Sequence, residues 1–124
     1  MWIINTDGFY SVVAIDEEPE QLLVRTRTKG DAKRFAVRCA PRLGYEPTIF
    51  KTPERDYAFR MVVPRAVVGR IMGEAIDQID YDNFKDAVAK RRGWDREAVY
   101  ASVWTVLYNG LQRAIPGRKR GADW

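Results

Sequence analysis

The sequence predicts an α+β fold: a permuted ferredoxin-like antiparallel sheet with its helices on one face, followed by two C-terminal helices. Segments rich in β-branched and aromatic residues show the alternation of strands, and the segments between and after them show helical spacing. The element order ββαββα results when the last strand of a ferredoxin-like βαββαβ fold is moved to its front. The 124 residues suit one domain, which we expect at 1–115, with a flexible basic tail at 116–124.

Four strands are expected in the first half of the chain. Residues 9–15 are β-branched and aromatic, and residues 22–28 place alternate side chains on opposite faces. The short acidic loop between them, 16–20, indicates a hairpin. Further on, a short strand at 48–51 precedes a longer one at 57–63, in which large apolar residues alternate on one face.

Helical spacing and end signals place the first two helices. We expect Asp31 to cap the first helix and Pro41 to end it. Pro64 opens the second helix, whose apolar residues form one nearly ideal stripe facing a core. The stripe consists of Val67, Val68, Ile71, Met72, Ala75, Ile76 and Ile79.

Two further helices are expected in the C-terminal part. Asp80 is the expected cap of the third helix, which runs to Gly93, and Asp95 is the expected cap of the last. The last helix is more apolar than one stripe requires, so it is either mostly buried or in contact with a partner. Its aromatic residues allow a homodimer interface, with closure of the domain core as the equal alternative.

Composition excludes several classes of function. The chain has no histidine and a single cysteine, Cys39, so Ser-His-Asp and Cys-His catalysis are excluded in their usual form, as are most zinc sites. We therefore expect a non-enzymatic protein without a cofactor, in which Cys39 is buried and inert. One cysteine fits a reducing cytoplasm, and no apolar run approaches the ~20 residues that span a bilayer. We expect a cytoplasmic protein with no membrane contact.

Several segments together resemble a family of small uncharacterised proteins from bacterial and phage genomes. The matching segments are 8–13, 22–27, 56–60, 79–85 and 100–108, and the most specific of them contains Asp80-Tyr81-Asp82-Asn83-Phe84-Lys85. The resemblance brings no activity with it. It allows a phage or mobile-element origin, for which a modulator of a host protein is a natural role.

The acidic and aromatic segment before the third helix is the first candidate site. Rigid aromatic and hydrogen-bonding groups at a helix end make good anchors for a protein partner. The alternative is that its aromatic residues pack in the core while Asn83 and Lys85 are solvated. Together with the last helix, the candidate partner-binding residues are Tyr81, Asp82, Asn83, Lys85, Trp104 and Tyr108.

Four aspartates surround the same segment: Asp77, Asp80, Asp82 and Asp86. Clustered carboxylates suit a hard divalent cation, but the spacing lacks the glycine turn of an EF-hand. Favourable charge at a helix N-terminus is the simpler explanation, so no metal site is predicted.

Arginines on two strands provide the alternative function, nucleic-acid binding. Alternation places Arg25 and Arg27 on one face, where Arg60 and Tyr10 could join them. The structural alternative is an ordinary solvated outer face of the sheet. The tail residues Arg118, Lys119 and Arg120 would add non-specific affinity. The leading hypothesis is an interaction protein with a protein partner; nucleic-acid binding through these basic residues is the alternative.

Overall fold

The computed structural model describes residues 1–113. Contacts divide the chain into two compact units, Met1–Asp80 and Tyr81–Trp124. The boundaries expected from the sequence, a domain at 1–115 and a basic tail at 116–124, stay predictions, and the expected tail lies outside the described residues.

The expected α+β class is confirmed, with a five-stranded antiparallel sheet in the first unit. The strands are β1 (Trp2–Ile4), β2 (Phe9–Ala14), β3 (Gln21–Thr26), β4 (Phe50–Lys51) and β5 (Phe59–Pro64). Their order across the sheet is β1-β2-β3-β5-β4. Every expected strand is present in shortened form, and β2 pairs with β3 as the expected hairpin. The sequence did not predict β1, because three residues are too few to show a period.

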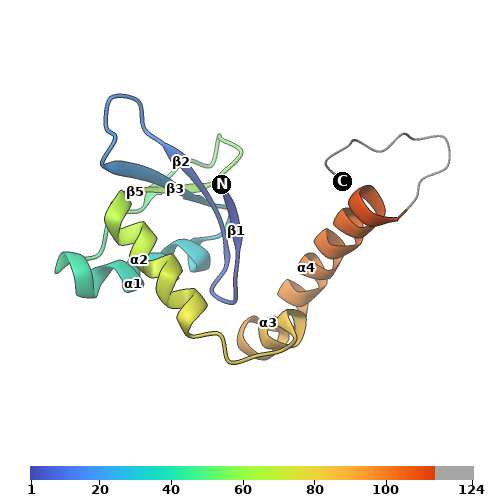
Figure 1. The fold of residues 1–124 in the computed structure, drawn as a ribbon. Coiled ribbons are helices and arrows are strands. Elements are labelled where there is room, and N and C mark those ends of the chain that lie inside the picture. The colour runs from blue at the N-terminus through green and yellow to red at the C-terminus, as the bar shows by residue number, and fades with distance from the viewer. Residues whose placement is uncertain (114–124) are drawn as a thin grey trace. The chain divides into compact units, whose positions relative to one another are not determined.

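Two helices, α1 (Lys29–Leu43) and α2 (Arg65–Asp77), pack on the sheet through β3 and β5 (Figure 1). The expected ends of α1 were wrong. Thr28, not Asp31, is its N-cap, and its side chain accepts a hydrogen bond from the backbone N–H of Asp31. Pro41 does not end the helix, which continues to Leu43. The helix stops at Gly44, whose φ of 77° suits glycine.

The core of the first unit lies between one face of the sheet and the two helices. Val12, Val24 and Met61 are paired in register across three strands, so their side chains share that face. Phe35 and Ile71 cover them from the two helices. Fully burying one large apolar side chain contributes about 1.5–3 kcal/mol, so this cluster supplies much of the stability of the unit.

A buried carboxylate ties the start of β2 to α1. Asp31 is 2% exposed and accepts a hydrogen bond from the backbone N–H of Phe9 at 3.0 Å. It also pairs with Arg34. A Cβ on Gly8 would lie 2.4 Å from the Asp31 Cγ, so this close approach requires glycine at position 8.

The second unit is built from α3 (Phe84–Arg92), α4 (Trp94–Leu107) and a short π-helix, η1 (Tyr108–Gln112). The N-caps expected at Asp80 and Asp95 were wrong: Asn83 precedes α3, and Gly93 precedes α4. Gly93 is also the C-cap of α3, and its φ of 95° favours glycine. One residue therefore ends one helix and begins the next.

Candidate binding surfaces

The acidic and aromatic segment before α3 folds against α4 through its rings. Tyr81 lies 6.0 Å from Phe84, and Phe84 stacks on Tyr100 at 5.9 Å between ring centroids. Tyr100 is buried, whereas Phe84 is half-buried. Tyr81 is half-buried, and Arg91 lies 5.9 Å from its ring centroid. Phe84 and Tyr81 therefore both lie at the edge of the core of the second unit, where Phe84 contacts the buried Tyr100.

Asn83 and Asp82 differ in what they do locally. The Asn83 Oδ1 accepts a hydrogen bond from the backbone N–H of Asp86 at 3.0 Å, which caps α3. Asn83 thus caps the helix although it is exposed, and Asp82 is exposed as well.

Lys85, Trp104 and Tyr108 lie together. The Lys85 Nζ lies 5.2 Å from the centroid of the Trp104 ring, within the range of a cation–π interaction. Trp104 and Tyr108 are stacked at 5.3 Å with an angle of 3° between their planes. Three of the six residues expected to bind a partner therefore form one cluster across α3, α4 and η1, which we call the Trp104 cluster.

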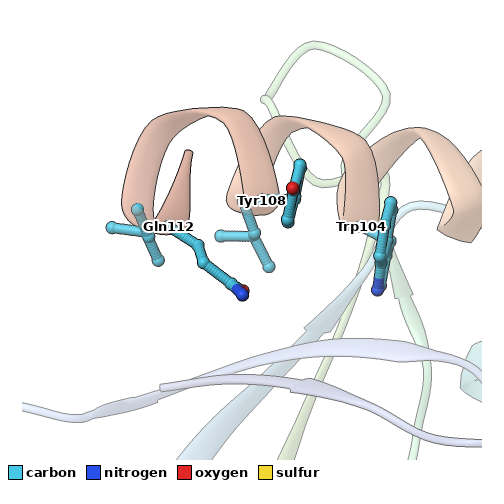
Figure 2. A pocket seen from close by; sticks show the side chains of 5 residues that line it. Trp104, Tyr108 and Gln112 are labelled. Atoms are coloured by element: carbon cyan, nitrogen blue, oxygen red, sulfur yellow. The ribbon is translucent and has the colours of Figure 1, made fainter. Parts of the chain in front are cut away.

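A hollow of about 220 Å³ lies beside this stack at the C-terminal end of α4. It is lined by Trp104, Leu107, Tyr108, Leu111 and Gln112. Figure 2 shows Trp104, Tyr108 and Gln112 projecting from successive turns toward the same side. The change to π-helical geometry at Tyr108 occurs within the lining, and π-helical turns are frequent at functional sites.

Most of α4 is apolar and uncovered within its own unit. Only Tyr100 of α4 is buried, and the contacts of the helix within residues 81–113 are with α3 and η1. Its exposed large apolar side chains, with those of η1, are Trp94, Val99, Val103, Trp104, Val106, Leu107, Tyr108 and Leu111. Trp104 is 55% exposed and Val106 is 70% exposed. Most of the large apolar side chains of the last helix are therefore exposed within this unit and do not form a core.

Arg25 of β3, Arg60 of β5 and Arg27, which directly follows β3, come together on the face of the sheet opposite α1 and α2. Arg25 and Arg60 are directly paired across β3 and β5. The guanidinium carbons of Arg25 and Arg27 lie 4.6 and 4.4 Å from the centroid of the Tyr57 ring. Tyr10 does not join them: it is 1% exposed and packs against Phe35 in the core. Its place in strand β2 points it to the opposite face, because Ser11, not Tyr10, pairs with Arg25.

Hydrogen bonds hold these arginines in place. Arg25 Nη2 donates to Ser11 Oγ at 2.6 Å, and Arg27 Nη1 donates to the Asp56 carbonyl oxygen at 2.6 Å. Arg60 Nη2 forms an ion pair with the Asp56 carboxylate at 3.3 Å. The other basic residues of the nucleic-acid hypothesis, Arg118, Lys119 and Arg120, lie outside the described residues.

Metal and thiol chemistry find little support in residues 1–113. No group of three or more His, Cys, Asp or Glu side chains there is placed to hold a metal ion, the aspartates around α3 included. Cys39 is fully buried in α1, and burial raises the pKa of its thiol to about 11. At neutral pH this thiol is protonated and a poor nucleophile.

No helix within residues 1–113 has the length and apolarity to cross a bilayer. In comparisons with known proteins, no family model, no curated sequence and no solved structure matches the chain. The resemblance carried by the segment Asp80–Lys85 therefore stays a prediction.

Proposed function

We propose that the chain is a non-enzymatic interaction protein that binds a protein partner through α4 and the Trp104 cluster. The observation that carries this proposal is the uncovered apolar surface of α4. Contiguous exposed apolar surface on a protein in water commonly marks a site of protein association. Burying one such side chain against a partner removes apolar area worth about 1.5–3 kcal/mol.

The Trp104 cluster is the proposed anchor within that surface. Trp104 and Tyr108 hold each other in a fixed stack, so little side-chain entropy is lost when a partner packs on them. Tryptophan and tyrosine are enriched among residues that dominate binding energy. Lys85 adds one positive charge beside the apolar surface. The favoured partner presents apolar side chains next to a carboxylate.

The resemblance to small bacterial and phage proteins supports a host protein as the partner. A cytoplasmic modulator of a host protein, without a cofactor, is the version we propose. The same residues also allow a second copy of the chain to bind at α4 in place of a host protein.

The test is capture of a partner by the full chain from a lysate of its host, with nuclease present, followed by calorimetry with the purified partner. Trp104→Ala is the test variant, and Trp2→Ala is the matched control because Trp2 is an exposed tryptophan of β1, outside α4. We expect wild type and Trp2→Ala to bind one partner at a fixed ratio, and Trp104→Ala to bind at least tenfold more weakly. Circular dichroism of each variant checks the fold.

Equal binding by Trp104→Ala would contradict the proposal, as would recovery of no partner. If the purified chain forms a dimer and Trp104→Ala dissociates it, the partner at α4 is a second copy of the chain and not a host protein. Gel filtration over a range of protein concentrations distinguishes the two occupants.

We also propose that the first unit is a permuted ferredoxin-like fold. The order β2-β3-β5-β4, its antiparallel pairing and the positions of α1 and α2 in the chain support this topology. On this interpretation β1 is an added edge strand. A crystal structure with a different strand order would contradict it.

A further inference from the structure

One row of side chains crosses the whole sheet on the face opposite α1 and α2. The register pairs Trp2 with Ser11, Ser11 with Arg25, Arg25 with Arg60, and Arg60 with Phe50. Directly paired residues place their side chains on the same face. Neighbouring strands lie about 4.8 Å apart, so the row extends about 19 Å. We call it the arginine–aromatic row: Trp2, Ser11, Arg25, Arg60 and Phe50.

The middle of the row concentrates positive charge. Like charges directly opposite each other across two strands destabilise a sheet, and Arg25 and Arg60 hold that position. Arg27 lies beside them over the Tyr57 ring, and Asp56 pairs with Arg60 through an exposed carboxylate. Of the three guanidinium groups, that of Arg60 pairs with this carboxylate in these contacts, Arg27 donates to the Asp56 backbone carbonyl, and Arg25 donates to Ser11. This charge balance favours an anionic ligand.

Arg25 is held ready for such a ligand. Its guanidinium lies on the buried Tyr57 ring and donates to Ser11, which is 1% exposed. Its Nε is buried and has no hydrogen-bond partner among the described residues. A fixed guanidinium loses less entropy than a free one when it binds a planar or tetrahedral oxyanion.

Both ends of the row carry exposed aromatic rings. Trp2 is 72% exposed and Phe50 is 53% exposed. Phe9 supports Trp2 edge to face at 5.7 Å and stacks with Tyr57 at 6.5 Å, so the aromatic surface continues beside the arginines. Within the first unit, α1 and α2 pack on the other face and leave this one without a helix. Exposed rings that flank fixed cations on an open sheet suit base stacking combined with phosphate contacts.

We propose that the arginine–aromatic row binds a short single-stranded nucleic acid. Bases stack on Trp2 and Phe50, while Arg25 and Arg60 neutralise the phosphates between them. A duplex fits poorly, because its bases are already stacked and reading its grooves requires an element that protrudes from the protein. An acidic peptide would satisfy the arginines but would leave the two exposed rings without stacking partners. The proposal uses the first unit alone and is independent of the partner proposed for α4.

Fluorescence anisotropy with labelled single-stranded DNA and RNA of twelve nucleotides, and with a duplex of the same sequence, tests the proposal. The full chain is used, so that residues 114–124 contribute equally in every variant. Base stacking on one aromatic side chain is worth roughly 5- to 100-fold in affinity. We expect Trp2→Ala to weaken binding by about tenfold, whereas Tyr45→Ala, an exposed ring in the loop after α1, leaves it unchanged.

Charge is tested by the salt dependence. Loss of one phosphate contact to a single strand lowers the slope of log affinity against log salt by about 0.7. We expect this change for Arg60→Gln and no comparable change for Arg70→Gln, an exposed arginine on α2. Trp2→Ala should keep the wild-type slope.

Three results would overturn the proposal: no binding at low salt, equal affinity of Trp2→Ala and Tyr45→Ala, or preference for the duplex. Displacement of the oligonucleotide by a short polyglutamate peptide at matched charge would instead assign the surface to an acidic protein. If Arg60→Gln fails to fold, Trp2→Ala still decides, because Trp2 is an exposed residue of an edge strand.

Discussion

Gly8 and Asp31 show how one absent side chain fixes a long-range contact. The Asp31 carboxylate occupies the space that a Cβ at position 8 would need, and there it binds the backbone N–H of Phe9. The contact joins residues that are 22 positions apart in the chain. It replaces the capping role that the sequence suggested for Asp31, which Thr28 performs instead.

Gly8→Ala should therefore destabilise the first unit by about 2–3 kcal/mol, because the new methyl group displaces a buried carboxylate that has partners. Gly69→Ala on α2 is the matched control, since its Cβ meets nothing within 4 Å. Alanine at that helical position should be neutral or stabilise by up to about 1 kcal/mol. Urea denaturation followed by circular dichroism measures both. Equal stability of the two variants would show that the close approach of Gly8 to Asp31 is not required.

Cys39 makes the stability of the first unit sensitive to alkaline pH. Burial raises the pKa of its thiol from 9.0 to about 11 in the folded protein. Above pH 9 the unfolded chain loses this proton while the folded chain keeps it, so the unfolded state gains stability. The free energy of unfolding should fall between about pH 9 and pH 11, by roughly 2–3 kcal/mol from this residue. Below pH 9 the thiol contributes no pH dependence.

Cys39→Ala isolates this effect, because every other titratable residue is the same in both proteins. The difference in unfolding free energy between wild type and Cys39→Ala should change from pH 8.5 to pH 11. A constant difference would mean that the thiol titrates normally in the folded state. In agreement with burial, native Cys39 should react with a thiol reagent far more slowly at pH 8 than in urea.

At the level of elements, local patterns were enough to predict strands β2, β3, β4 and β5 and the existence of helices α1 to α4 within residues 1–113. The alternation of apolar residues in 57–63 and the apolar stripe after Pro64 depend only on residues that are close in the chain, so both can be recognised from the sequence alone. Helix ends are decided by competing hydrogen bonds. Asp80 and Asn83 are both good caps, and only Asn83 lies where its side chain reaches the N–H of Asp86.

The candidate surfaces were predictable only in part. That α4 is too apolar for one stripe is visible in its composition, and the structure leaves that surface bare within its unit. The approach of Lys85 to Trp104 depends on how α3 packs on α4, which no local pattern encodes. Likewise, the pairing of Arg25 with Arg60 requires β3 and β5 to be neighbours, although α1 and β4 separate them in the chain.

At the scale of the whole molecule, the division into two compact units predicts separate responses to mutation. Met61 is fully buried in the core of the first unit, and its truncation to alanine should cost about 2–5 kcal/mol there. Hydrogen exchange should then accelerate in β3, β5 and α1 of Met61→Ala, while α3 and α4 keep their wild-type protection. Mass spectrometry of the exchanged peptides measures this. Equal acceleration in α3 and α4 would show that the whole chain unfolds as one cooperative body.

The two edges of the sheet limit how this protein can associate. β1 and β4, the outermost strands, have three and two residues, and each offers few backbone groups for pairing with another chain. Short edge strands are one of the ways in which natural sheets avoid uncontrolled edge-to-edge growth. Addition of a foreign strand is therefore a poor route into this fold. Partners therefore bind through side chains and not through backbone pairing. Single substitutions can for that reason test both proposed surfaces.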